Sequence, residues 1–184
     1  MAATKESNLQ HDLRLRAMTS HDLRWLQAAI PQLKEYLLSN EIFWNVGSDP
    51  QLTLGNLLLA EAKVKASGSD KKLLAEISAQ KIEWHTAWEN KATREFASRL
   101  RQWTQYLAEL AEHPSRYSAQ YKSEVRVRAL LELLAGEAPR LSSQLTAADS
   151  TLKALTTSGE FVWDKDVEAA YPKSKYWFLW AKVK

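Results

Sequence analysis

The stretch that decides the fold is residues 71–113, KKLLAEISAQKIEWHTAWENKATREFASRLRQWTQYLAELAEH. It contains neither glycine nor proline, and its apolar residues recur at steps of three, four or seven positions from Leu73 to Leu110. This spacing is typical of an amphipathic helix. His113 precedes Pro114, and a residue before a proline is pushed out of the α region. We therefore predict one long central helix that ends at His113.

The length of this helix constrains the shape of the protein. If unbroken, the helix would be about 65 Å long at about 1.5 Å per residue, which exceeds the diameter of a compact domain of 184 residues. Three alternatives follow. The protein is elongated, or the helix is broken, or one end of it projects and meets a partner.

A second apolar stripe lies before the long helix. Its residues, at steps of 3, 4, 3 and 4, are Leu23, Leu26, Ile30, Leu33 and Leu37. They predict a helix capped by Ser20, which Pro31 should kink or split. The polar residues 1–10 before it are expected to form a loose arm.

Two further boundaries separate this stripe from the long helix. Ser48-Asp49-Pro50 reads as a cap followed by an N1 proline, and so predicts a helix over residues 50–66. Residues 67–70, Ser-Gly-Ser-Asp, should close that helix and cap the next one.

Helical spacing continues after Pro114. We predict helices over residues 118–135 and 139–157, with Gly136 and Gly159 just past their ends. About five helices with short connections make a bundle. The sequence thus predicts an all-α fold, an elongated bundle of about five helices with one long central helix, as a single domain over residues 1–184.

The last segment, residues 160–184, differs in composition from the rest. It holds seven of the 18 aromatic residues. We predict a short helical turn over residues 164–170, and residues 176–183 are either extended or helical. This aromatic-rich tail is expected to fold back and pack on the bundle.

Composition and motifs argue against most catalytic chemistries. The absence of cysteine excludes disulfides, thiolate metal sites and cysteine nucleophiles. The chain has no Glu-x-x-His pair, no G-x-S-x-G elbow and no phosphate-binding glycine loop. We therefore predict no metal site, no cofactor and no enzymatic activity. We also expect no membrane span and no secretory signal, and hence a cytoplasmic protein.

The first functional hypothesis is a non-catalytic subunit or adaptor that binds a protein partner or itself through helix faces. The eight tryptophans either fill the core or anchor such a partner. The candidate contact residues are Trp84, Trp88 and Trp103, together with the stripe Leu23, Leu26, Ile30, Leu33 and Leu37.

The alternative hypothesis is a nucleic-acid-binding accessory subunit. The chain carries 25 basic and 22 acidic residues, a net charge of +3, and cations gather in residues 91–128. If the two helices of this region are antiparallel neighbours, a basic stripe could follow a phosphate backbone. The candidate residues are Arg94, Arg101, Arg126 and Arg128, extended by Lys173 and Lys175 beside aromatic rings of the tail.

Overall fold

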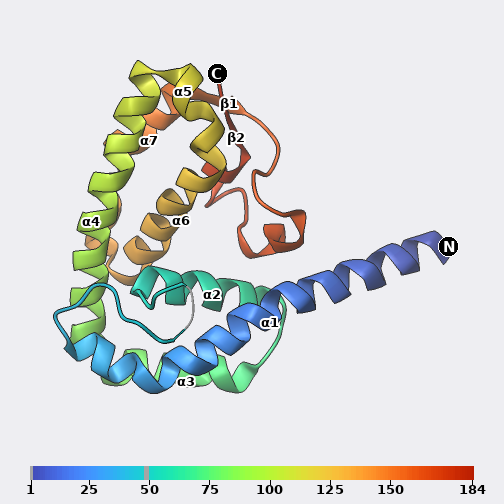
Figure 1. The fold of residues 1–184 in the computed structure, drawn as a ribbon, viewed down its shortest axis with the longest axis vertical. Coiled ribbons are helices and arrows are strands. Elements are labelled where there is room, and N and C mark those ends of the chain that lie inside the picture. Colours follow the sequence, from blue (N-terminus) through green and yellow to red (C-terminus); the bar gives the residue numbers. More distant parts are fainter. Residues whose placement is uncertain (1, 48–49) are drawn as a thin grey trace.

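The chain is helical almost throughout, as predicted. The computed structural model describes residues 2–47 and 50–184, and the side chains of residues 20–47 and 50–184. The helices are α1 (Ala2–Leu38), α2 (Leu54–Ala66), α3 (Lys71–Glu83), α4 (His85–Glu112), α5 (Pro114–Tyr117), α6 (Tyr121–Glu137) and α7 (Leu145–Leu155). Four short 3-10 helices, η1 (Ser118–Gln120), η2 (Pro139–Gln144), η3 (Lys165–Ala170) and η4 (Trp177–Trp180), and two strands, β1 (Thr156–Ser158) and β2 (Ala181–Val183), complete it (Figure 1).

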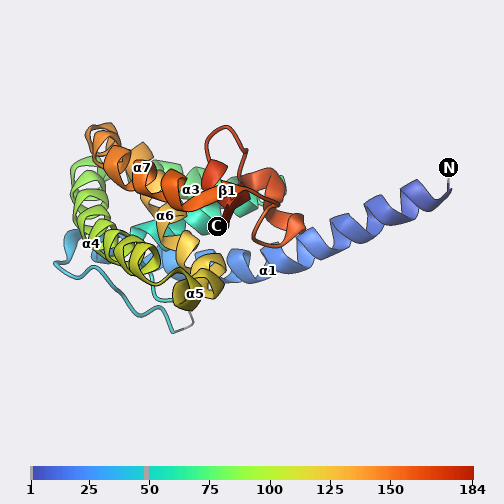
Figure 2. The same cartoon turned by 90° about the horizontal axis from the view of Figure 1, so that it is seen from above.

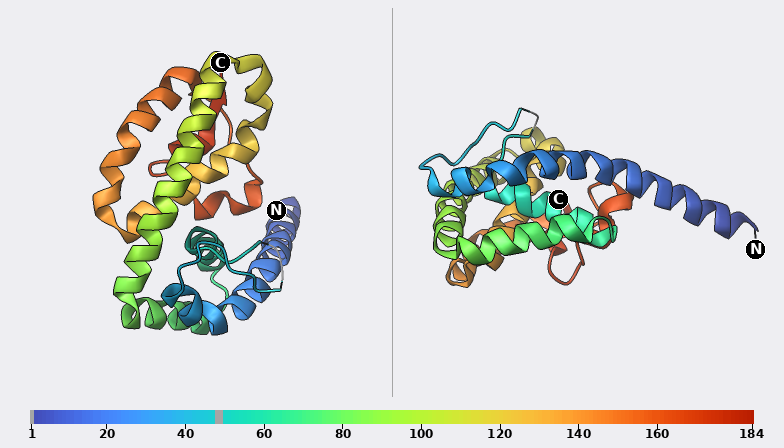
Figure 3. Two further views of the ribbon diagram at one scale, coloured as in Figure 1. Left: turned by 60° about the vertical axis from the view of Figure 1, so that its left-hand side comes forward. Right: turned by 90° about the horizontal axis from the view of Figure 1, so that it is seen from below.

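The helices form an elongated bundle built around α4. α4 runs along one side of the molecule and packs mainly against α6 (Figures 1 and 3). α1, α2 and α3 lie together at one end, whereas α5, β1 and β2 lie at the other (Figure 1). The N-terminal turns of α1 leave the body and project away from it (Figure 2).

The core is continuous between α1, α2, α4 and α6. Every residue from Leu52 to Ala60 is buried, so the start of α2 is surrounded by protein. Gly55 lets α4 approach closely, because a Cβ at this position would lie 2.8 Å from Oε1 of Glu95. The backbone N–H of Gly55 donates to Oε2 of Glu95 at 3.0 Å. A buried carboxylate thus satisfies an unpaired amide at the α2 N-terminus.

The long stretch is two helices, with the break at Trp84. Trp84 has φ −109° and ψ 30°, outside the helical region. Contacts with α1 accompany the turn: Gln80 donates to the carbonyl of Ile30 at 3.1 Å, and Nζ of Lys34 lies 4.8 Å from the centre of the Trp84 ring. Of the three alternatives for this stretch, the structure has the broken helix within an elongated bundle.

Several predicted boundaries near the N-terminus shift. α1 is helical from Ala2, so residues 2–10 are its first turns and not a separate arm, and Pro31 lies within the helix without splitting it. α2 is capped by Thr53, whose side chain accepts from the amide of Asn56. Ser48 and Asp49, predicted to cap α2, lie outside the described residues. The caps predicted around residues 67–70 are confirmed, since Ser67 ends α2 and Asp70 caps α3.

The C-terminal helices are also shifted. α6 starts three residues later than predicted and contains Gly136. Residues 139–144 form η2, so α7 starts at Leu145 and ends at Leu155. Thr156 is extended and begins β1, which pairs antiparallel with β2 at the end of the chain. Gly159 follows β1, and its N–H donates to the carbonyl of Trp180 at 2.7 Å.

The aromatic tail packs on the bundle, as predicted. Its rings contact one another edge to face, as Trp163 and Tyr171 do at 5.2 Å between centroids. Tyr121 of α6 donates its hydroxyl to the carbonyl of Phe178 at 2.8 Å, and Trp163 donates to the carbonyl of Lys122 at 3.1 Å. The predicted turn near residues 164–170 is η3, capped by Asp164.

Candidate functional site

The residues predicted to form a protein interface lie inside the molecule. Trp88 and Trp103 are 1% and 0% exposed, and Trp88 donates to Oε2 of Glu137 at 2.7 Å, which ties α4 to the end of α6. Trp84 and Leu23 are half-buried against the same core. The buried members of the set are Leu26, Ile30, Leu33, Leu37, Trp88 and Trp103. These side chains join the helices to one another, so a surface for a partner must come from other residues.

The four predicted arginines do not form one exposed stripe. Arg94 and Arg101 are exposed on α4, and Arg94 donates to the carbonyl of Asn40 at 2.6 Å. Arg126 is half-buried. Arg128 is 2% exposed, so a phosphate backbone cannot reach it.

Arg128 is fully engaged by carboxylates. Its Nε and Nη2 donate to the two oxygens of Asp149 at 2.7 and 2.9 Å, and its Nη1 donates to Oε2 of Glu132 at 3.0 Å. The guanidinium also lies 4.4 Å from the ring centre of Phe178. This arrangement is the bidentate pairing that makes a buried arginine tolerable, and it links α6, α7 and the tail.

A basic and aromatic surface does form where α7, β1 and the tail meet. A hollow of about 260 Å³ is lined by Lys153, Thr156, Thr157, Ser158, Lys173, Trp177, Trp180 and Ala181. Trp177 and Trp180 are half-buried, and Nζ of Lys153 lies 5.0 Å from the centre of the Trp177 ring. We call Lys153, Lys173, Trp177 and Trp180 the lysine–tryptophan surface.

The lysines of this surface stand apart from the acidic side chains that the structure describes. Among the described side chains, no carboxylate lies at ion-pair distance from Lys153 or Lys173. Lys175, predicted with Lys173, is exposed beside the Tyr176 ring at 5.5 Å. Lys184 follows β2 and donates to the carbonyl of Ala154 at 2.6 Å. The local charge is therefore positive and accessible to solvent.

Sequence reasoning missed Lys153. It lies in the last turn of α7, whereas Lys173 and Lys175 follow Pro172 in the tail. The pairing of β1 with β2 brings the two segments together. In the sequence, Lys153 is a lysine shortly before Thr156-Thr157-Ser158. Its position near Lys173 cannot be predicted without knowing that β1 pairs with β2.

A second hollow is lined in part by Lys91. The lining of this space, about 410 Å³, includes Lys91 and Arg94. The amine of Lys91 donates to Oγ of Ser39 at 3.1 Å and to the carbonyl of Glu41, and it faces the Tyr36 ring at 4.3 Å. Burial, with the nearby Arg94 charge, lowers the pKa of Lys91 to about 8. Because its donors are occupied, this lysine holds the segment after α1 in place.

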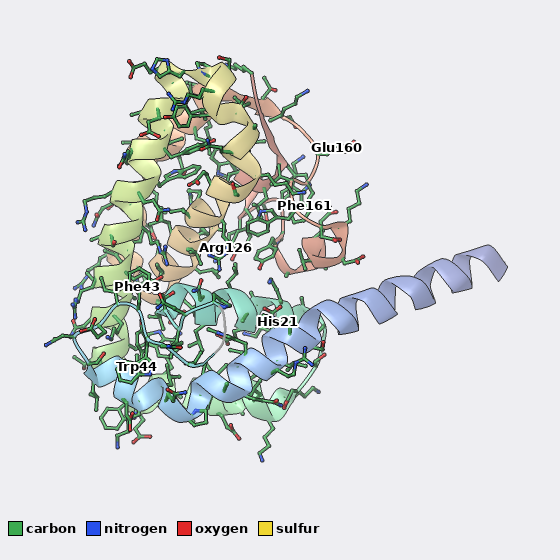
Figure 4. The ribbon with its side chains drawn as sticks, in the orientation of Figure 1. His21, Phe43, Trp44, Arg126, Glu160 and Phe161 are labelled. Carbon is green, nitrogen blue, oxygen red and sulfur yellow. The ribbon has the colours of Figure 1, made fainter. Side chains whose placement is uncertain are left out.

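A third hollow lies beside Arg126, where α1, α2, α6 and the tail meet. Its volume is about 230 Å³, and its described lining residues are Leu59, Lys63, Arg126, Trp163, Asp164 and Val167. Figure 4 shows Arg126 between α6 and α2. Burial lowers the pKa of Arg126, and the positive charge of Arg99 lowers it further.

Two further findings concern metals and membranes. In residues 20–47 and 50–184, no group of three or more His, Asp or Glu side chains is placed to hold a metal ion. None of the helices in the described residues has the length and apolar character needed to cross a membrane.

Comparison of the chain with known protein families, with curated proteins and with solved structures gives no match in any of the three. Functional argument therefore rests on the chemistry of these surfaces.

Proposed function

We propose that this chain is a non-catalytic binding protein whose ligand is single-stranded nucleic acid, bound at the lysine–tryptophan surface. The observation that carries the proposal is the position of two half-exposed tryptophans beside two lysines that have no carboxylate at ion-pair distance in the described part of the chain. Proteins that bind single strands combine cations, which contact phosphates, with aromatic rings, on which bases stack. The overall charge of +3 and the isoelectric point of about 9.0 agree with a polyanionic ligand.

The test is the affinity of the purified protein for a fluorescent oligothymidylate, measured by anisotropy over a range of salt concentrations. The double variant Lys153→Gln/Lys173→Gln should weaken binding about tenfold at low salt. It should also reduce the slope of log affinity against log salt by about 1.4, because each phosphate contact on a single strand contributes about 0.7.

The matched control is Lys71→Gln/Lys72→Gln, which removes the same charge from exposed positions on α3 at the opposite end of the molecule (Figure 1). This control should bind like the wild type. Equal weakening in both double variants would show an unspecific charge effect, and no binding by the wild type at low salt would contradict the proposal.

A second candidate function is self-association through α1, and the projection of its N-terminal turns favours it (Figure 2). Most helical stability in proteins comes from tertiary packing, and these turns stand apart from the body of the molecule. We infer that a second copy of the chain covers these turns. Light scattering on the full chain and on a variant beginning at Ser20 tests this inference.

A further inference from the structure

Arg126 is a half-buried guanidinium whose described hydrogen-bond partner is neutral. Its Nη2 donates to Oδ1 of Asn56 at 2.7 Å, and this neutral amide is its hydrogen-bond partner among the described residues. No carboxylate there lies at ion-pair distance. A guanidinium has five N–H donors, so most of its donor capacity remains unused.

Among the described side chains, the neighbouring arginines, unlike Arg126, are paired with carboxylates. Arg128 holds two carboxylates, and Arg99 pairs with Oε1 of Glu95 at 3.4 Å. A charge removed from water is costly unless it is paired. Burial lowers the pKa of Arg126 and the like charge of Arg99 lowers it further, whereas the charges of Glu95 and Asp22 raise it. An anion beside Arg126 would supply the direct ion pair that this guanidinium lacks among the described side chains.

The space beside Arg126 suits a small ligand with an apolar part. The hollow of about 230 Å³ corresponds to about seven or eight water molecules at about 30 Å³ each. Leu59, Val167 and Trp163 supply apolar walls. Trp163 has its indole N–H bound to the carbonyl of Lys122 and its ring held against Tyr171, so this wall is fixed.

The other charged residues around the hollow favour a ligand with a single negative charge. Lys63 is paired with Asp22 at 3.4 Å, and Asp164 uses Oδ1 to accept from the amide of Asp166 at 3.0 Å. The carboxylate of Asp164 in the lining, and that of Asp22 paired with Lys63, disfavour an anion with more than one charge. One guanidinium fork is complementary to one carboxylate.

A second buried polar group lies in the same region. The side chain of Tyr171 is fully buried, and its hydroxyl has no hydrogen-bond partner among the residues that the structure describes. Burial raises the pKa of Tyr171, and the charges of Asp22 and Arg126 both act on it. The Tyr171 hydroxyl and the Arg126 guanidinium thus lie close enough to interact electrostatically, behind the described lining of the hollow.

We propose that the hollow at Arg126 binds a small monocarboxylate with an apolar body. The carboxylate forms a bidentate pair with the guanidinium, and the apolar body lies between Leu59, Val167 and Trp163. The site is separate from the lysine–tryptophan surface, because the two hollows share no lining residue.

The experiment is isothermal titration of the full chain with hexanoate at constant ionic strength. Hexanol has the apolar body without the charge, and inorganic phosphate has charge without the body. Hexanoate should bind saturably, and the two comparison compounds should bind at least about tenfold more weakly. Absence of saturable hexanoate binding up to about 10 mM would overturn the proposal.

Variants locate the binding within the fold. Arg126→Gln should weaken hexanoate binding at least about tenfold. Arg126→Lys keeps the charge but loses the planar pair of donors, so its affinity for hexanoate should lie between those of the wild type and Arg126→Gln. Val167→Phe should also abolish binding, because the ring fills the hollow and leaves Arg126 in place. Arg101→Gln, on the exposed face of α4, should bind like the wild type. Wild-type affinity in both Arg126→Gln and Val167→Phe would overturn the assignment.

Discussion

Arg126 and Arg128 lie two positions apart on α6, each after a buried valine, yet they meet opposite environments. In the sequence Val-Arg-Val-Arg, nothing distinguishes the two arginines. What separates them is Asp149, a residue of α7 that only the fold brings to Arg128. Sequence reasoning could therefore predict a basic region here, but it could not predict which arginine is paired and which faces a hollow.

The difference predicts opposite responses to substitution by methionine. Arg128→Met leaves Asp149 and Glu132 without their cation, and it should lower the free energy of unfolding by about 3–5 kcal/mol. Arg126→Met removes a charge that has no carboxylate at ion-pair distance among the described side chains, so the free energy of unfolding should stay within about 1 kcal/mol of the wild type or rise. Urea denaturation followed by tryptophan fluorescence measures both. A loss at Arg126 as large as that at Arg128 would show that Arg126 is a structural residue.

At the scale of elements, some local signals held and others did not, since Pro31 and Gly136 both lie inside helices. The caps at Ser67 and Asp70 follow from residue types alone. No glycine or proline marks the break at Trp84, so the local sequence does not predict it. The break is accompanied by contacts of Gln80 and Trp84 with α1, which only the fold provides. The β1–β2 pair was missed because each strand has three residues and finds its partner across the whole tail.

The projecting part of α1 makes the prediction at this scale. The full chain, of 21.0 kDa, should elute as a dimer, about twice that mass, because pairing buries helix turns that stand apart from the body. The variant beginning at Ser20 keeps the contacts of Asp22 and Trp25 with the body, and it should be a folded monomer. A full chain that is monomeric by light scattering would rule out self-association through α1.

At the scale of the whole molecule, the apolar stripes that suggested an interface are the interior. The sequence shows which residues form the stripes, but it does not show whether they lie in the core or on the surface. That depends on how α1, α2, α4 and α6 pack around one another. The all-α class and the packed aromatic tail were predicted correctly, since both follow from periodicity and composition. The hollows beside Lys153 and beside Arg126 could not be predicted, because each is lined by residues from segments far apart in the chain.

The most direct test of the proposed function is to map where a single strand contacts the protein. Ultraviolet crosslinking to oligothymidylate, followed by trypsin digestion and mass spectrometry, should place the nucleotide on the peptide of residues 176–182, which contains Trp177 and Trp180. Crosslinks confined to peptides of α3 or α4, or no crosslink to this peptide from a complex that forms at low salt, would contradict the account.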